Sequence, residues 1–179
     1  MLLTSIDFET TGAVPGYPNE PWQIGLVAIE DGRIVEESRF TSWLRVDAKR
    51  PFNKFAPGRH SQIRDTLAEA PTLVELWPEL TKRILGIPLI AHNAATERNI
   101  LTKTFPLHPF GPWVDTLTLA RETLPGLPSY ALEDVLRALD LMDEMARLCP
   151  DTAPHDALYD AMGAALAYRA FSENSFLSE

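Results

Sequence analysis

Apolar and polar residues alternate over the first part of the chain, which is typical of β-strands. Residues 2–8 predict a first strand, because leucine, isoleucine, threonine and phenylalanine favour a pleated surface. Residues 22–30 predict a second strand and residues 33–46 a third, and Asp31 and Gly32 between them are a strong hairpin signal. The chain is therefore expected to open with an antiparallel part of a sheet.

Helical spacing of apolar residues dominates the rest of the chain. Thr72 and Glu75 form a capping box that predicts a helix from Thr72 to about residue 85. Residues 47–70 are expected to be irregular. The remaining predicted elements are strands over residues 87–91 and 113–114, a helix ending near residue 105, a helix capped by Asp115 and Thr116 and ending near residue 124, helices over residues 130–139 and 157–171, and one helical turn around residues 144–148.

Three strands followed by alternating helices and strands indicate an α/β fold. We expect a mixed sheet of five strands flanked by helices. At 179 residues the chain is long enough to bury one good core, so a single domain over residues 1–179 is expected.

Composition narrows the class of protein. Apolar residues make up 45% and charged residues 23%, which is ordinary for a globular domain. No apolar run approaches the roughly 20 residues of a membrane helix, and the first residues lack the features of a signal peptide. Cys149, the single cysteine, excludes an internal disulfide. These features predict a cytoplasmic protein without a membrane partner.

The net charge of −9 argues against a general nucleic-acid coat. Basic side chains are nevertheless concentrated between residues 45 and 64, where six of them accompany one acid, Asp47, to give a local charge of +5. Such a loop can attract a phosphate backbone or can be a solvated loop, and the sequence leaves both readings open. The six are Arg45, Lys49, Arg50, Lys54, Arg59 and Arg64.

Two carboxylates stand at the end of the first predicted strand. Asp7 and Glu9 are two residues apart and share one face, whereas Ile6 and Phe8 take the other face. Neighbouring carboxylates repel each other unless a cation lies between them or one holds a proton, and hard divalent ions prefer carboxylate oxygens. A solvated strand end is the alternative interpretation.

Two further acids lie in elements predicted to be buried. Asp160 and Arg169 are the only charges in the apolar helix over residues 157–171, and a buried carboxylate needs a partner or a metal. Glu97 falls in the first turn of the helix after the fourth strand. Complementarity to the helix dipole would also explain either acid. His155 is a candidate general base because its imidazole titrates near neutral pH, or it is a cap or surface residue.

These motifs together resemble the DEDDh-type 3′–5′ exonucleases, the family of the proofreading epsilon subunit of bacterial DNA polymerase III. The resemblance covers most of the chain. Its segments are Asp7 to Gly12 for the first motif, Trp22 to Gly25, His60 to Thr72 for the linker usually written HGIT…APT, Ala91 to Ala94 opening the second motif, Val114 to Leu117, and His155 to Ala161 for the third motif.

The resemblance implies a ribonuclease-H-like fold and metal-dependent hydrolysis of phosphodiester bonds from the 3′ end of single-stranded or frayed DNA or RNA. It implies two divalent metal ions, Mg²⁺ or Mn²⁺, and suggests a DNA polymerase or repair complex as a partner. The implied metal ligands are Asp7, Glu9, Glu97 and Asp160, the implied base is His155, and the implied contacts to the terminal nucleotide are Thr10, Thr11, Gly12 and Asn93.

The chain departs from the family pattern at two places. Thr96 and Glu97 replace the usual Phe-Asp, and His60 to Ile63 reads His-Ser-Gln-Ile in place of HGIT. These departures motivate an alternative, a catalytically weakened exonuclease fold that acts as a nucleic-acid-binding or polymerase-associated module. A third interpretation is a hydrolase of small nucleotides or very short oligoribonucleotides. The preference for DNA or RNA, the pathway and the oligomeric state do not follow from the sequence.

Overall fold

The structure is a computed structural model that describes residues 1–56, 58 and 60–176. The described residues form five strands, seven α-helices and one 3₁₀-helix. The helices are η1 (His60–Gln62), α1 (Arg64–Glu69), α2 (Trp77–Ile84), α3 (Ala95–Thr104), α4 (Thr116–Thr123), α5 (Leu132–Ala138), α6 (Met142–Leu148) and α7 (Ala157–Phe176).

The first strand, β1 (Leu2–Thr10), lies at the centre of the sheet. On one side β2 (Pro21–Glu30) and β3 (Arg33–Trp43) extend the sheet with antiparallel pairing. On the other side β4 (Leu89–Ala91) and β5 (Trp113–Asp115) extend it with parallel pairing. The order β3-β2-β1-β4-β5 confirms the predicted mixed sheet of five strands flanked by helices.

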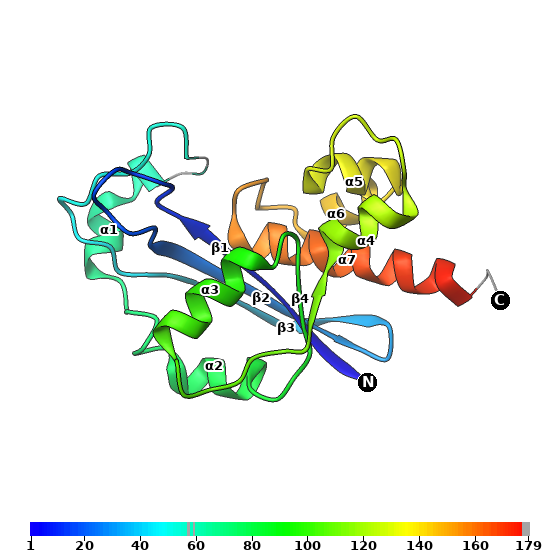
Figure 1. Cartoon of the computed structure of the whole chain (residues 1–179), viewed down its shortest axis with the longest axis horizontal. Helices are drawn as coiled ribbons and strands as arrows, with labels where there is room; N and C mark the ends of the chain where they lie inside the picture. Colours follow the sequence, from blue (N-terminus) through cyan, green and yellow to red (C-terminus); the bar gives the residue numbers. More distant parts are fainter. Residues whose placement is uncertain (57, 59, 177–179) are drawn as a thin grey trace.

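Two hydrophobic cores lie on opposite faces of this sheet. On one face, Val27 and Ile29 of β2 belong to the core that includes residues of α4, α5, α6 and α7. On the other face, Ile24 and Leu26 belong to the core that includes residues of α2 and α3. Successive side chains of a strand point to opposite faces, so one strand supplies both cores. Figure 1 shows α2 and α3 below the sheet and α4 to α7 above it.

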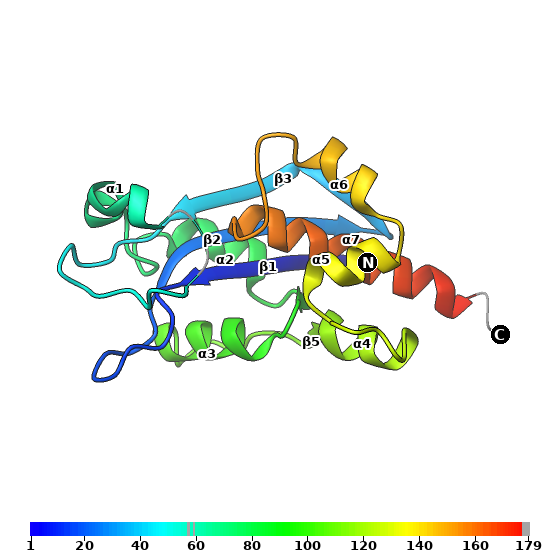
Figure 2. The ribbon, with the colours of Figure 1, turned by 90° about the horizontal axis from the view of Figure 1, so that it is seen from above.

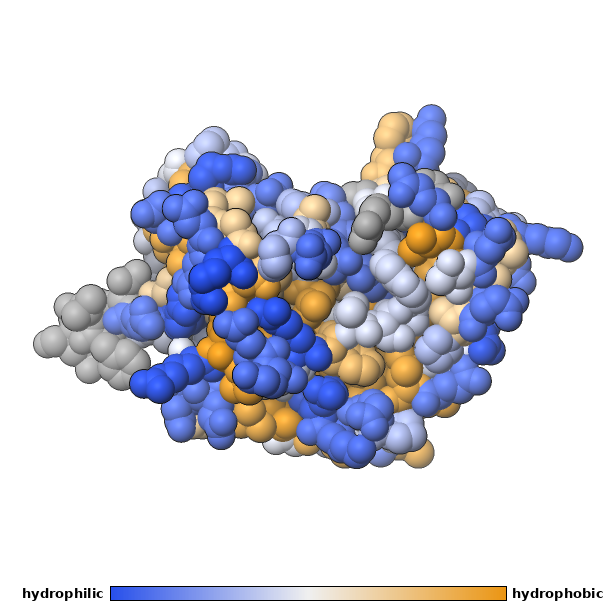
Figure 3. Space-filling view, turned by 180° about the vertical axis from the view of Figure 1, so that it is seen from behind, coloured by the Kyte–Doolittle hydropathy of each residue, from blue (hydrophilic) through white to orange (hydrophobic). Residues whose placement is uncertain are grey.

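The exposed edge of the sheet at β3 carries charged side chains. Arg39 pairs with Glu36 at 2.8 Å, and Arg147 of α6 reaches Glu36 at 3.4 Å. Charged residues on an edge strand oppose pairing with another chain. Figure 2 places β3 on the side facing away from the viewer of Figure 1, and the view of that side in Figure 3 is dominated by hydrophilic residues with hydrophobic ones between them.

Several predicted boundaries were wrong because tertiary contacts changed them. The capping box forms, with Glu75 donating its amide to Thr72 Oγ1 at 3.2 Å, but α2 begins only at Trp77, where Pro78 suits the first helical turn. The third strand ends at Trp43 and not at residue 46. The fourth strand begins at Leu89, since Pro88 has no amide to donate to the ladder.

Four helices were missed or underestimated. The region predicted to be irregular contains η1 and α1, and Leu67 of α1 is buried in a small cluster with Trp22 and Val46. The single turn predicted around residues 144–148 is the full helix α6. The final helix extends to Phe176. No helix among the described residues is both long enough and apolar enough to cross a membrane.

Candidate active site

The acidic pair of β1 faces α7, as the alternation of the strand predicts. Asp7 is paired with Gly25 of β2 and Glu9 with Gln23, so the four residues share one face of the sheet. Glu9 is only 7% exposed. The intervening Phe8 belongs to the core on the opposite face. The two carboxylates therefore lie beneath the helix that carries Asp160.

Close contact between β2 and α7 brings Asp160 to this pair. A Cβ atom on Gly25 would lie 2.2 Å from the carbonyl carbon and oxygen of Ala157, so only glycine permits this approach. Gln23 binds both sides of the helix start: its Oε1 accepts from the Ala157 amide at 3.2 Å, and its Nε2 donates to Asp156 Oδ2 at 2.9 Å. Ser5 Oγ donates to the Ala161 carbonyl at 2.7 Å one turn further on.

Three of the predicted residues form a compact group. Each of Glu9, His155 and Asp160 offers one ligand atom, and these atoms all lie within 4.8 Å of one another. The exposed His155 has a left-handed backbone with φ of 66°, and its amide donates to Asp160 Oδ2 at 3.2 Å. The structure thus brings together residues that are about 150 positions apart in the sequence.

Glu97 reaches the same region from the first turn of α3. The turn before α3 is held by Asp115, which accepts from the amides of Asn93 at 2.9 Å and Ala94 at 3.2 Å. The same carboxylate accepts from Leu117 at 3.0 Å, so the predicted cap of α4 is confirmed. Glu97 is 3% exposed, and its Oε2 is buried with no hydrogen-bond partner among the described residues.

The carboxylates repel one another strongly. Burial, followed by repulsion from Asp160 and Glu97, raises the pKa of Asp7 well above its ordinary value. Burial and the neighbouring Asp160 raise the pKa of Glu9 to about 8. Burial is also the largest cause that raises the pKa of Asp160 to about 7 and the pKa of Glu97 to about 7. The cluster needs protons or cations to be stable.

This donor set fits hard divalent cations. Carboxylate oxygens are the ligands that Mg²⁺ prefers. An unpartnered buried oxygen such as Oε2 of Glu97 is costly unless it is paired or coordinates a metal. Asp7, Glu9, Glu97 and Asp160 can therefore hold cations here, with the His155 ring beside them.

A cavity of about 210 Å³ opens at the cluster, and Asp7, His155 and Asp160 line it. His92 and Glu133 also line it, and the sequence analysis did not single out either as a site residue. His92 Nε2 donates to the Tyr130 carbonyl at 2.9 Å, and its Nδ1 lies 2.9 Å from Thr116 Oγ1. Burial lowers the pKa of His92, so the ring is neutral and holds the start of α5 against β4.

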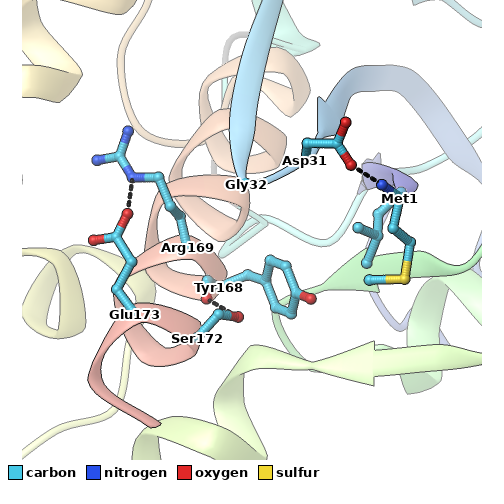
Figure 4. Close-up of a pocket in the computed structure, with 8 residues that line it drawn as sticks. Met1, Asp31, Gly32, Tyr168, Arg169, Ser172 and Glu173 are labelled. Atoms are coloured by element: carbon cyan, nitrogen blue, oxygen red, sulfur yellow. Dashed lines mark hydrogen bonds and ion pairs between the residues drawn. The ribbon is translucent and has the colours of Figure 1, made fainter. Parts of the chain in front are cut away.

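A larger cavity, of about 500 Å³, lies at the opposite end of β1. Tyr168 and Ser172 of α7 form part of its wall (Figure 4). Its charged groups pair with each other: the Met1 amino group contacts Asp31, and Arg169 reaches other acids on α6 and α7. We therefore place the candidate site at the smaller cavity.

Three of the four predicted substrate contacts, Thr10, Thr11 and Gly12, lie at the end of β1 and just after it, and Asn93 lies before α3. Thr11 is fully buried, and its amide donates to the Glu20 carbonyl at 2.8 Å. Thr10 and Gly12 are partly exposed on either side of it, and Asn93 is exposed at the start of α3. Thr11 holds this loop in place, and the binding roles of all four residues stay predictions.

Known proteins are similar to this chain in sequence and in fold. The family model RNase_T, described as an exonuclease, matches residues 4–168. A DNA polymerase III of PolC type from Thermotoga petrophila is 30% identical over 140 residues, which are 76% of this chain and 10% of that protein. A 3′-5′ exonuclease DinG from Staphylococcus saprophyticus is 29% identical over 137 residues, which are 74% of this chain and 15% of that protein. The chain thus spans less than a fifth of the length of these two relatives.

A solved structure supports the fold independently. The nuclease domain of 3′hExo, a DEDDh family member bound to rAMP, superimposes with a TM-score of 0.70 at 19% identity. The match covers 97% of this chain and 92% of that one. The predicted ribonuclease-H-like exonuclease fold is therefore confirmed.

Proposed function

The chain belongs to the RNase_T family of exonucleases, and on this premise we propose that it removes nucleotides from the 3′ end of single-stranded or frayed nucleic acid. One observation carries the proposal. Acidic residues from β1, α3 and α7 converge with His155 at one end of the sheet, where burial raises the pKa of all four and repulsion within the cluster adds to the shift for Asp7 and Glu9. Such a cluster is costly to fold and is typical of a functional site.

We propose that Asp7, Glu9, Glu97 and Asp160 hold two divalent ions, Mg²⁺ or Mn²⁺. When bound, these ions would neutralise the carboxylates and stabilise the negative charge on the attacked phosphate. The compact group of Glu9, His155 and Asp160 and the unpartnered oxygen of Glu97 support this assignment.

His155 is proposed as the general base. Its ring is exposed next to Asp160, so a water molecule at the cavity can reach it. Removal of a proton from that water by the imidazole lets the oxygen form a bond to phosphorus while the bond to the 3′ oxygen breaks. The leaving 3′ oxygen takes a proton from solvent, and His155 returns the proton it accepted to solvent. The products are a nucleoside 5′-monophosphate and a strand with a new 3′-hydroxyl.

The terminal nucleotide would lie against the turn after β1. Thr10, Gly12 and Asn93 are the proposed contacts, and all three are at least partly exposed. Thr11 would contribute indirectly, because its amide holds the loop that the nucleotide contacts.

The names of the two relatives suggest the substrate and the partner of this chain. One is a DNA polymerase and the other a 3′-5′ exonuclease, and in both the matched region is a small part of a longer protein. We propose DNA or RNA 3′ ends as substrates, the cytoplasm as the location, and a DNA polymerase or repair complex as the partner.

Digestion of an oligonucleotide carrying a label at its 5′ end tests this function directly. With Mg²⁺ or Mn²⁺ we expect a ladder of products shortened from the 3′ end, and with EDTA we expect none. Asp7→Asn should abolish the ladder, whereas Glu122→Gln, which changes an exposed acid on α4, should leave it intact. Folded protein that binds the strand but never shortens it would support the non-enzymatic module instead.

A further inference from the structure

Two exposed aromatic rings lie on the loops that follow β1. Phe55 is 80% exposed and Tyr17 is 50% exposed. Single exposed hydrophobic residues are common on protein surfaces, so exposure by itself does not indicate a function. The attachment of these two loops to the candidate active site distinguishes them.

Both loops are hydrogen-bonded to Thr11, two residues after Glu9. The Thr11 amide donates to the Glu20 carbonyl at 2.8 Å in the loop that carries Tyr17. The Asn53 amide donates to the Thr11 carbonyl, also at 2.8 Å, in the loop that carries Phe55. Figures 1 and 2 show both loops at the end of the molecule toward which β1 runs.

Two close approaches join the loop that carries Phe55 to segments of the candidate site. At one end, a Cβ on Gly12 would lie 2.8 Å from Asn53 Cβ, so the two segments are in close contact. At the other end, a Cβ on Gly58 would lie 3.2 Å from the His155 carbonyl oxygen. The loop therefore lies beside the segments that carry Glu9 and His155, and a strand whose 3′ end enters the cluster can pass along it.

Four residues of the basic cluster predicted from the sequence fall into two groups, and Arg59 lies outside the described residues. Arg50 is 5% exposed and donates to Thr11 Oγ1 at 3.2 Å, and Arg64 donates to the Ala48 carbonyl at 2.7 Å. These two side chains hold the loops together. Lys49 and Lys54 are exposed, and the Lys54 ammonium lies 4.8 Å from the centre of the Phe55 ring.

We propose that Phe55 is a stacking platform for a base upstream of the 3′-terminal nucleotide, with Lys54 beside the adjoining phosphate. This inference rests on the proposed exonuclease function. Aromatic rings stack on any base, and a neighbouring cation attracts the backbone of a single strand. The backbone that carries the ring is already held by the Phe55 amide, which donates to Asn53 Oδ1 at 2.9 Å, so less backbone freedom is lost on binding.

The platform predicts that activity depends on the length of the strand. For wild-type protein, kcat/KM should rise along a ladder from dinucleotide to octanucleotide, once the strand reaches Phe55. Phe55→Ala should lower the ratio of kcat/KM for the octamer to that for the dimer by roughly 5- to 100-fold, whereas Phe55→Trp should keep it.

Leu107 offers a matched control. It is 91% exposed, and the rings of its neighbours Phe105 and His108 lie against Trp77 of α2 in tilted contacts, on the face of the sheet opposite α7. Leu107→Ala should leave the ratio unchanged. The same ratio in Phe55→Ala and wild-type protein, or an equal loss in Leu107→Ala, would overturn the proposal.

Binding measurements separate this proposal from the proposed function. If the wild-type protein cleaves no strand of any length, the function fails but the platform can still be tested. Fluorescence anisotropy of a labelled oligo-dA octamer in EDTA should then show weaker binding to Phe55→Ala than to wild-type protein. Equal affinity of the two proteins would exclude the platform.

Discussion

Without divalent ions, the stability of this protein should fall as the pH rises from 5 to 8. Burial is the main cause that raises the pKa of Glu97 from 4.5 to about 7. Between these values the folded protein holds a proton that the unfolded chain has released. The part of the unfolding free energy that depends on this proton is therefore fully present below pH 4.5 and is lost as the pH rises through about 7.

The size of the effect follows from the same shift. Raising the pKa of Glu97 from 4.5 to about 7 corresponds to about 3 kcal/mol of unfolding free energy lost at pH 8. For a chain of this length, that loss lowers the melting temperature by roughly 6–12 °C. Glu9, whose pKa burial and Asp160 raise to about 8, adds to the loss in the same direction. Ions that bind at 100 times their Kd would restore about 2.7 kcal/mol.

Thermal unfolding followed by circular dichroism can measure this loss of stability with pH. We expect the melting temperature in EDTA to drop between pH 5 and pH 8, and Mn²⁺ at pH 8 to reverse most of the drop. Glu97→Gln should flatten the pH dependence and raise the melting temperature in EDTA at pH 8. The exposed-acid control Glu122→Gln should follow the wild-type curve.

Two results would refute the reasoning. A melting temperature in EDTA that stays constant or rises from pH 5 to pH 8 would show that the carboxylates are not destabilised by burial. A Glu97→Gln protein with the full wild-type pH dependence would show that Glu97 is not a source of the effect.

Three shorter predictions test other parts of the site. Glu97→Asp should keep or raise nuclease activity and Glu97→Ala should nearly abolish it, measured as initial rates with Mn²⁺; full activity in the alanine variant would remove Glu97 from the proposed metal ligands. His155→Ala should lower kcat by roughly 100- to 10,000-fold with little change in melting temperature, because the side chain is exposed; an unchanged kcat would remove His155 as the base. Gly25→Ala should cost about 3 kcal/mol or more in urea unfolding, because its Cβ would collide with Ala157; wild-type stability would show that α7 can move away freely.

Local rules predicted much of the fold. The alternation in β1 correctly separated Asp7 and Glu9 from Ile6 and Phe8. The hairpin signal at Asp31 and Gly32 is confirmed by left-handed φ values of 48° and 78° at these residues. These features depend on a few neighbouring residues, so a single sequence is enough to recognise them.

Contacts between distant segments decided the rest. Nothing local indicates that Leu67 packs on Trp22 and so forms α1 in a stretch rich in proline and glycine. Likewise, Gln23 lies two positions from Gly25, but its two hydrogen bonds to the start of α7 exist only because that helix crosses β2.

The sequence by itself determined which acidic residues are candidates for the site and which strand face or helix turn each one occupies. Only the tertiary structure decided that Asp160 and Glu97 approach the end of β1, that Arg50 and Arg64 hold loops, and that the loop carrying Phe55 approaches Gly12 and His155. The physical reason is that periodicity along the chain reports the direction of a side chain, whereas its partners depend on how elements far apart in sequence pack together.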